Sequence, residues 1–238
     1  MRGVIFEIEG RWAHFRKPET NNNPLTHDFI TKTALIGMVG AVLGKNRLEM
    51  LEIFPLLSEG LIYGVQVLND VKKFSFGFTS WKLGGTSKSE QSQVRKRMEI
   101  IKDPSYRIAL AFQKVEATDY FNDFVDSLKN DFARYTPILG LHNCPAILKS
   151  ETVLEGEFEE KNGEFETHSF LALSYQKLTN VKQTKNFRIG IENIPTYQKD
   201  FFNPLDKYVP VAYPTNFNSI FGEGRYFEFD NKSKWALI

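Results

Sequence analysis

An apolar segment over residues 31–44 constrains the fold of this chain more than any other feature. It reads Thr-Lys-Thr-Ala-Leu-Ile-Gly-Met-Val-Gly-Ala-Val-Leu-Gly. A helix with this sequence is apolar on nearly every side, so it has to be buried inside the protein. Thr31 is a candidate N-cap and Gly44 a candidate C-terminal glycine. The segment therefore predicts a buried helix.

The N-terminal end of this helix is a candidate phosphate-binding site. Thr31, Lys32 and Thr33 place two hydroxyls and an ammonium beside the unpaired N–H groups of the first turn, and we expect this end to point out of the core. Lys45 and Arg47 add two cations beyond the other end. The pattern favours a protein that holds a phosphodiester chain over one that converts metabolites.

Aromatic residues and cations also occur together before this helix. Residues 11–17 read Arg-Trp-Ala-His-Phe-Arg-Lys, and they include Trp12 and Phe15. An aromatic ring stacked on a nucleic-acid base contributes about 1–3 kcal/mol. Trp81, beside a basic segment, is a third candidate for stacking. Packing in the core is the alternative for each of these residues, and it is favoured for Phe15.

The charges are unevenly distributed, although the 30 basic and 29 acidic residues give a net charge of only +1. Segment 151–166 holds seven glutamates and one lysine, and segment 71–102 is strongly basic. This division predicts a positive face that could meet phosphate and a separate negative face. Two solvated surface segments of opposite sign are the alternative. The basic residues of 71–102 are Lys72, Lys73, Lys82, Lys88, Arg95, Lys96, Arg97 and Lys102, against Glu90 and Glu99.

Hydrophobic periodicity predicts an α+β fold for residues 1–150. Strands are expected over residues 4–8, 61–68, 72–81 and 106–112, where apolar residues alternate or cluster. Thr118 is expected to cap a second helix with an apolar stripe of Phe121, Phe124, Val125, Leu128 and Phe132. Residues 82–100 lack periodicity and are expected to form a loop or an extended arm. The order β-α-β-β-α-β is that of a ferredoxin-like (RRM-like) domain.

Residues 151–238 are expected to form a smaller, all-β C-terminal part. Asn162-Gly163 is a strong signal for a hairpin turn between two strands. Further strands are expected over residues 187–191, 209–213 and 225–229.

Signatures of enzymes are mostly missing from the sequence. Cys144 is the only cysteine, which excludes an internal disulfide and cysteine-based zinc clusters. There is no Gly-Lys-Ser/Thr phosphate loop, and Gly222-Glu223-Gly224 lacks the third glycine of a dinucleotide site. We expect no cofactor, no metal and no small-molecule substrate. The start does not resemble a signal peptide, and the longest apolar run is too short to span a bilayer, so we expect a cytoplasmic protein without a membrane partner.

Metal-free RNA cleavage remains an alternative, because histidine can serve as a general acid or base. His14 and His27 flank the basic loop and are the candidates, although hydrogen bonding or surface exposure is the favoured interpretation of both. His142 and Cys144 are too close in sequence to favour a nucleophile–base pair.

The residues quoted so far resemble the CRISPR-associated protein 5 family. The resemblance rests on Phe6 to Gly10, Ala13, Phe15-Arg16-Lys17-Pro18, Thr31 to Gly37 and Gly44, with a second motif in Tyr135 to Gly140 and Cys144-Pro145-Ala146. Ile30 stands where the family often has proline. The variant of type I-B interference complexes is the most similar.

The resemblance implies a ferredoxin-like domain with an extended β-hairpin thumb at about 71–102 and a smaller C-terminal β part. Members of the family bind the 5′ handle of the CRISPR RNA and cap the Cascade backbone beside the large subunit in antiviral defence. The expected partners are therefore this RNA and the backbone and large subunits. Residues expected at the RNA are Arg16, Lys17, Thr31, Lys32, Thr33, Lys45, Arg47, Lys72, Lys73, Trp81, Lys82, Arg95, Lys96, Arg97, Gly140, His142 and Asn143.

Three functions are compatible with these patterns. A non-catalytic CRISPR RNA-binding subunit is the leading hypothesis. The second is a metal-independent endoribonuclease that processes repeat RNA, as in one branch of the family that uses Tyr, Lys and His; no matching trio is found in this sequence. The third is a protein scaffold whose positive arm meets acidic protein surfaces.

Overall fold

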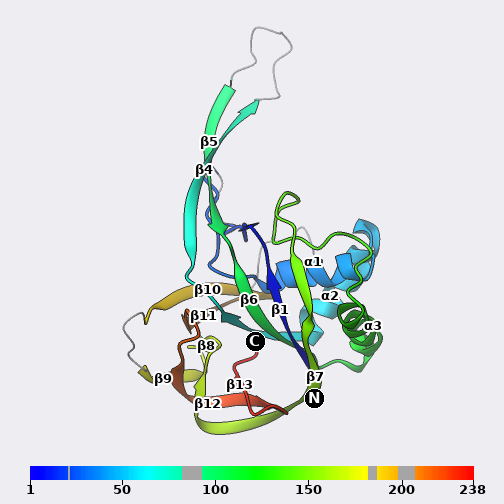
Figure 1. Ribbon diagram of the computed structural model, residues 1–238, viewed down its shortest axis with the longest axis vertical. Coiled ribbons are helices and arrows are strands. Elements are labelled where there is room, and N and C mark those ends of the chain that lie inside the picture. The colour runs from blue at the N-terminus through cyan, green and yellow to red at the C-terminus, as the bar shows by residue number, and fades with distance from the viewer. Residues whose placement is uncertain (21, 82–92, 182–186, 198–206) are drawn as a thin grey trace.

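The computed structural model describes residues 1–20, 22–81, 93–181, 187–197 and 207–238 (Figure 1). It is a mixed α/β structure in which a curled antiparallel sheet is covered on one side by helices, and a long β-hairpin projects from the sheet. Its elements are β1 (Arg2–Glu9), β2 (Trp12–Ala13), α1 (Lys32–Val42), α2 (Arg47–Gly60), β3 (Leu61–Val67), β4 (Lys72–Trp81), β5 (Gln93–Lys102), β6 (Ser105–Phe112), a 3₁₀ turn (Val115–Ala117), α3 (Thr118–Lys129), β7 (Ile147–Thr167), β8 (Leu171–Ala172), β9 (Gln176–Val181), β10 (Ile189–Tyr197), β11 (Lys207–Pro214), β12 (Ile220–Phe229) and β13 (Lys234–Trp235).

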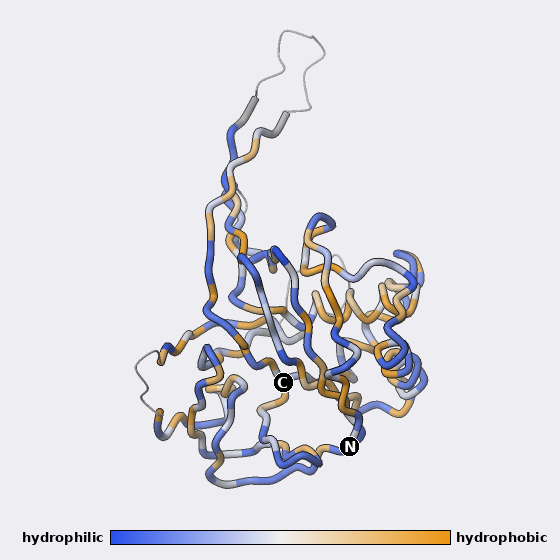
Figure 2. The backbone as a smooth tube through the Cα atoms, in the orientation of Figure 1, coloured by the Kyte–Doolittle hydropathy of each residue, from blue (hydrophilic) through white to orange (hydrophobic). Residues whose placement is uncertain are grey.

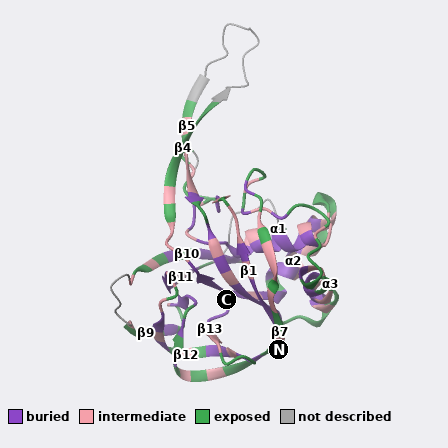
Figure 3. Cartoon of the chain, viewed as in Figure 1, coloured by how far each residue is buried: buried purple, intermediate pink, exposed green. Residues whose placement is uncertain are grey.

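The main sheet has the strand order β13-β12-β7-β1-β6-β3, and β9 also pairs with β12. Its central strand β1 is buried on both faces: Val4, Phe6 and Ile8 pack with the helices, whereas Ile5 packs with Phe227 on β12. Two smaller sheets, β10-β11-β8 and β2-β5-β4, complete the structure. Figures 2 and 3 show that hydrophobic and buried residues gather where the helices meet the sheet, whereas the hairpin is mostly exposed or intermediate.

The predicted buried helix is confirmed as α1. The Thr31 side chain accepts a hydrogen bond from the Ala34 N–H, and Gly44 follows the helix with φ +72°. The second expected helix is α3, but Thr118 is its first residue rather than a side-chain cap, and Phe132 lies exposed beyond its end. The inclusion of Phe132 in the apolar stripe was therefore wrong.

The helix α2 was not predicted. Asn46 Oδ1 accepts hydrogen bonds from the Leu48 and Glu49 N–H groups, and Glu49 Oε2 accepts one from the Asn46 N–H at 2.7 Å. This capping box satisfies N–H groups that would otherwise lack partners at the start of the helix. Within the described residues, none of the helices combines the length and the apolar character needed to cross a bilayer.

The prediction of a hairpin turn at Asn162-Gly163 was wrong, because both residues lie inside the continuous strand β7. Gly163 pairs with Gly224 of β12, and their φ angles are +140° and +138°. These angles favour glycine at both positions of the pair. The predicted boundary between residues 150 and 151 also falls inside β7, whose first half pairs with β1 and whose second half pairs with β12.

The projecting hairpin is formed by β4 and β5, which pair in register from Lys72↔Lys102 to Trp81↔Gln93. Residues 93–100, expected to be part of a loop or arm, are therefore a regular strand. Residues 82–92 lie outside the described residues. At its root β5 also pairs with β2, which joins the hairpin to the residues that follow β1.

Candidate nucleic-acid interface

The hairpin has two chemically different faces, because residues that pair directly across antiparallel strands point to the same side. One face carries Lys72, Phe74, Phe76 and Phe78 of β4, with Lys96, Met98, Ile100 and Lys102 of β5. The opposite face carries Lys73, Ser75, Gly77 and Thr79 of β4, with Arg95, Arg97, Glu99 and Ile101 of β5.

Several of the predicted cations are accessible along this hairpin. Lys72, Arg95 and Arg97 are exposed, and Lys96 is half-buried. Lys82 lies outside the described residues, and only the backbone of Trp81 is described. The described cations of this segment are distributed over both faces of the hairpin.

The root of the hairpin is held by a cluster of buried and half-buried charges. Lys73 Nζ lies 2.5 Å from Asp28 Oδ1 and 3.4 Å from Glu99 Oε2, and it donates a hydrogen bond to the Thr26 carbonyl at 2.9 Å. The Asp28 carboxylate also accepts a hydrogen bond from the Tyr213 hydroxyl of β11. These contacts link the loop before α1 to both hairpin strands and to the C-terminal part.

Glu192 on β10 belongs to the same cluster. Its carboxylate oxygens lie 2.9 and 3.1 Å from Lys17 Nζ, and 3.3 Å separates Oε2 from His27 Nδ1. Lys17 and Lys73 were both expected at the RNA, and the structure places both in ion pairs with carboxylates of the protein, where the side chains are 22% and 25% exposed.

The electrostatics of this cluster follow from competition between burial and pairing. Burial raises the pKa of Glu192, but hydrogen bonds from His27 and Lys17 outweigh it, so the pKa lies below its ordinary value. Burial lowers the pKa of Lys73, but the hydrogen bond and charge of Asp28, with Glu99 and Glu192, raise it overall. Both shifts favour the charged forms of Glu192 and Lys73.

Both candidate catalytic histidines are buried. His14 Nδ1 lies 2.7 Å from the Glu99 carbonyl oxygen, and burial lowers the pKa of this histidine. His27 contacts Glu192 through Nδ1 in the cluster at the hairpin root. Neither ring is accessible to an RNA 2′-hydroxyl. Both rings instead make hydrogen bonds within the protein, which is the interpretation favoured from the sequence.

The start of α1 does not point out of the core, and this expectation was wrong. Thr31 and Lys32 are buried and Thr33 is half-buried, because α1 contacts the distant strand β10. Lys32 lines a cavity of about 460 Å³ together with Thr196 of β10 and Val209 of β11. The C-terminal strands thus cover an end that sequence reasoning left open.

Three further predicted cations belong to other elements than the hairpin strands. Lys45 Nζ lies 5.7 Å from the ring centre of Tyr120, and Arg47 is the first residue of α2, so both belong to the helical layer. Arg16 is exposed and donates a hydrogen bond to the Thr20 carbonyl at 3.3 Å, in the loop that leads to α1.

The loop over residues 139–144 approaches the hairpin root. Gly140 has φ +90°, and a Cβ placed there would lie 2.0 Å from the His14 carbonyl oxygen, so its close approach is to the protein's own backbone. His142 and Asn143 are exposed. A pocket of about 290 Å³ lies between this loop and the hairpin, lined by Trp12, Phe74, Ser75, Phe76, Met98, Ile100, Leu141, Asn143 and Cys144.

Sequence reasoning missed the three phenylalanines of this surface. Phe74 and Phe76 are each 49% exposed and Phe78 is 36% exposed. Their alternation in Lys-Lys-Phe-Ser-Phe-Gly-Phe could have placed all three on one face of the strand. Trp12 is half-buried and makes an edge contact with Phe74, with ring centres 6.5 Å apart.

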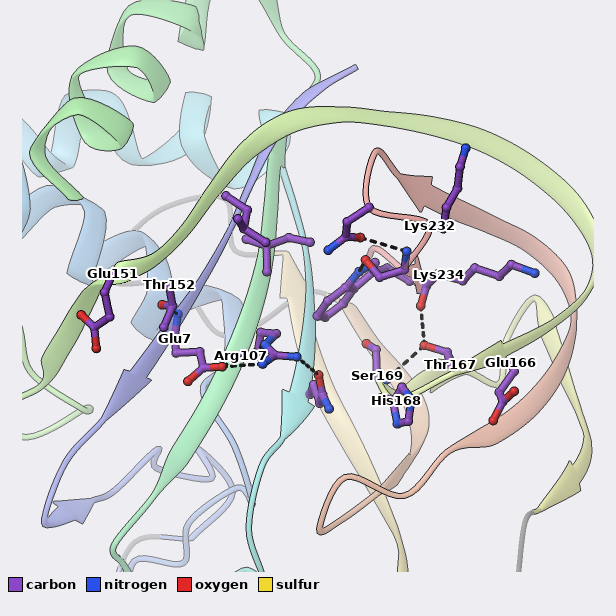
Figure 4. Close-up of a pocket in the computed structure, with 16 residues that line it drawn as sticks. Glu7, Arg107, Glu151, Thr152, Glu166, Thr167, His168, Ser169, Lys232 and Lys234 are labelled. Atoms are coloured by element: carbon purple, nitrogen blue, oxygen red, sulfur yellow. Dashed lines mark hydrogen bonds and ion pairs between the residues drawn. The ribbon is translucent and has the colours of Figure 1, made fainter. Parts of the chain in front are cut away.

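A larger cavity of about 800 Å³ lies inside the curl of the sheet (Figure 4). Its polar groups bind one another: Arg107 donates to Glu7 at 2.6 Å and to Gln66 at 3.4 Å, and Thr167 donates to the Lys234 carbonyl at 2.6 Å. Three acidic and three basic side chains line it, so it offers no net charge to a polyanion. In the described part of the chain, no group of three or more His, Cys, Asp or Glu side chains is arranged to hold a metal ion.

The sequence and the fold were compared with known proteins. Residues 3–176 match the family model described as CRISPR-associated protein (Cas_Cas5). The structure is similar to the crystal structure of a CRISPR protein from Archaeoglobus fulgidus, with a TM-score of 0.63 and 14% identity over 99% of this chain and 98% of that chain. It is also similar to a chain of a CRISPR RNA-guided surveillance complex, with a TM-score of 0.56 and 14% identity over 90% of both chains. No curated protein matches the sequence.

Proposed function

The chain belongs to the CRISPR-associated Cas5 protein family, and on this premise we propose that it is a non-catalytic subunit of a Cascade-type CRISPR effector complex that grips the 5′ handle of the CRISPR RNA. The family and the similarity to a chain of an RNA-guided surveillance complex support a subunit of such an assembly. Its proposed partners are the CRISPR RNA and the backbone and large subunits of Cascade. Assignment to subtype I-B stays a prediction.

The observation that carries the RNA-binding proposal is the projecting hairpin. It presents exposed cations on both faces, while the carboxylates at its root are already neutralised by Lys73 and Lys17. A single strand of RNA is held by such cations together with aromatic side chains. His14 and His27 are buried, which disfavours the alternative of an endoribonuclease that uses them.

The topology supports a ferredoxin-like (RRM-like) assignment for residues 1–150. With the hairpin set aside, β1, the α1–α2 pair, β3, β6, α3 and β7 follow one another in the order β-α-β-β-α-β, and the strands lie as β7-β1-β6-β3. In this arrangement the hairpin is an insertion between the second and third strands, which is the position proposed for the thumb.

The proposal is tested with RNA that co-purifies with the protein and with variants of the hairpin. Sequencing should find one uniform 5′ end. Arg95→Ala combined with Arg97→Ala should weaken binding of this RNA and lower the slope of log affinity against log salt by about 1.4, since each phosphate contact contributes about 0.7.

The matched control is Arg188→Ala, which removes an exposed arginine outside the hairpin. Equal affinity and equal salt dependence of the hairpin variant and this control would contradict the proposal, as would co-purifying RNA with random ends.

A further inference from the structure

One face of the hairpin exposes an aromatic stripe that the core does not use. Phe74, Phe76 and Phe78 remain between one-third and one-half exposed, and Met98 and Ile100 pair with the first two of them across the hairpin. A strand places successive residues of one face about 6.7 Å apart. The result is a row of rings leading from the root of the hairpin outward.

The same face is positively charged. Lys72, Lys96 and Lys102 lie on it, and none of the residues of this face in the described part of the hairpin is acidic. The nearby carboxylate of Glu99 lies on the opposite face, where it pairs with Lys73 at 3.4 Å.

This combination distinguishes between possible occupants. An apolar protein segment laid on the rings would bring uncompensated ammonium groups into an apolar contact, which is unfavourable. Single-stranded RNA supplies flat bases for the rings and phosphates for the ammoniums at the same time. Lys102 Nζ lies 5.9 Å from the ring centre of Phe74, so cation and ring already adjoin there.

The pocket at the root adds a place for one base. Phe74 and Phe76 form its hairpin side, and Leu141 and Asn143 belong to the loop that approaches it. Trp12 makes its edge contact with Phe74 in the same pocket. The exposed amide of Asn143 can both donate to and accept from the edge of a base.

We propose that bases of single-stranded RNA stack on the Phe74–Phe76–Phe78 face, that one base enters the pocket beside Asn143, and that Lys72, Lys96 and Lys102 contact the adjoining phosphates. This inference rests on the proposed RNA-binding function and deepens it, because it assigns bases to one hairpin face and leaves Arg95 and Arg97 on the other.

The test compares two synthetic probes with the same number of phosphates, a 12-nucleotide RNA and its abasic analogue. Phe76→Ala should weaken binding of the RNA about 5- to 140-fold, which corresponds to the loss of one stacked base at about 1.4 kcal/mol per tenfold. Binding of the abasic probe should be unchanged. Phe76→Trp should retain the affinity, and Phe132→Ala, which removes an exposed ring outside the hairpin, should behave as the unmodified protein.

A 2-aminopurine base in the RNA gives a second measurement, since its fluorescence falls when it stacks. The quenching should be lost in Phe76→Ala and altered in Asn143→Ala, while thermal unfolding of both variants stays that of the unmodified protein. If Phe76→Ala binds both probes normally while the Arg95/Arg97 variant does not, the base-stacking inference is overturned and the proposed function stands. If Phe76→Ala binds RNA normally but no longer joins the other Cascade subunits, the face is a protein contact. If the unmodified protein binds neither probe, both the inference and the proposed function fail.

Discussion

The buried carboxylate of Glu192 is predicted to stabilise the attachment of the C-terminal strands to the hairpin root. It is 7% exposed and lies 2.9 Å from Lys17 Nζ, 3.3 Å from His27 Nδ1 and 4.0 Å from Lys73 Nζ. Glu192→Gln preserves the size of the side chain but removes its charge. The Lys17 ammonium then loses its counter-ion in a site where it is only 22% exposed.

The magnitude follows from the number and the burial of these contacts. A hydrogen bond to a charged group contributes about 1.5–3 kcal/mol, and removing one partner of a fully buried pair costs about 3–5 kcal/mol. In Glu192→Gln the partly exposed Lys17 ammonium still contacts water, and the glutamine oxygen can still accept a hydrogen bond. Both effects reduce the loss of folding free energy. We expect the free energy of unfolding at pH 7 to fall by about 2–3 kcal/mol, as measured by urea unfolding.

The pH dependence gives an independent signature. The pKa of Glu192 is lowered, because hydrogen bonds from His27 and Lys17 outweigh the opposing effect of burial. A carboxyl group with a lower pKa in the folded state contributes stability that is complete above its unfolded pKa of about 4.3 and is lost as the pH falls toward the folded value. The stability advantage of the unmodified protein over Glu192→Gln should therefore shrink between about pH 5 and pH 2.

The matched control is Glu159→Gln, because Glu159 is 74% exposed and pairs with Lys161 at 3.1 Å. Exposed pairs contribute about 0–1 kcal/mol, so this variant should remain within about 0.5 kcal/mol of the unmodified protein. The reasoning is refuted if Glu192→Gln loses no more stability than Glu159→Gln. It is also refuted if the stability advantage of the unmodified protein over Glu192→Gln does not change with pH below 5.

Two further predictions concern local backbone structure. Gly140→Ala should lower the free energy of unfolding, measured by urea unfolding, by at least about 2 kcal/mol, because φ is +90° and the new Cβ would meet the His14 carbonyl oxygen. The control is Gly37→Ala on α1, where nothing lies within 4 Å of the new Cβ, and this variant should not be destabilised. Asn46→Ala should lower the free energy of unfolding by about 1 kcal/mol, because it removes the capping box of α2. Amide hydrogen exchange should be faster at the Leu48 and Glu49 N–H groups than in the unmodified protein, and unchanged exchange there would contradict the role of the cap.

The elements that the sequence predicted well are those specified by nearby residues. The helix α1 has its cap at Thr31 and its closing glycine at Gly44, and in β1 the apolar residues Val4, Phe6 and Ile8 recur at every second position. The capping box Asn46–Glu49 is also visible in the sequence, whereas Pro55 in the interior of α2 is a residue that normally opposes a helix.

The errors come from contacts between distant parts of the chain. Asn162-Gly163 has the composition of a tight turn, but β7 stays continuous there because its second half pairs with β12. The burial of Lys32 similarly depends on β10, which lies more than 150 residues further along the chain. Local composition contains no information about either contact.

The distribution of cations shows most clearly which part of a site a sequence can specify. Clustering in the sequence located the basic hairpin, but it could not separate Lys73, whose partners are Asp28 and Glu99, from Arg95 and Arg97, which have no carboxylate partner within the described residues. The difference arises because the carboxylates come from the loop before α1, from β5 and from β10, and these meet only at the root. The ion pairs of Lys73 hold the hairpin in place, and the positive charge that remains comes from exposed cations: Lys72 and Lys102 beside the root on one face, and Arg95 and Arg97 further out on the other. A partner that carries negative charge is thereby directed to the exposed faces of the hairpin rather than to the paired charges at its root.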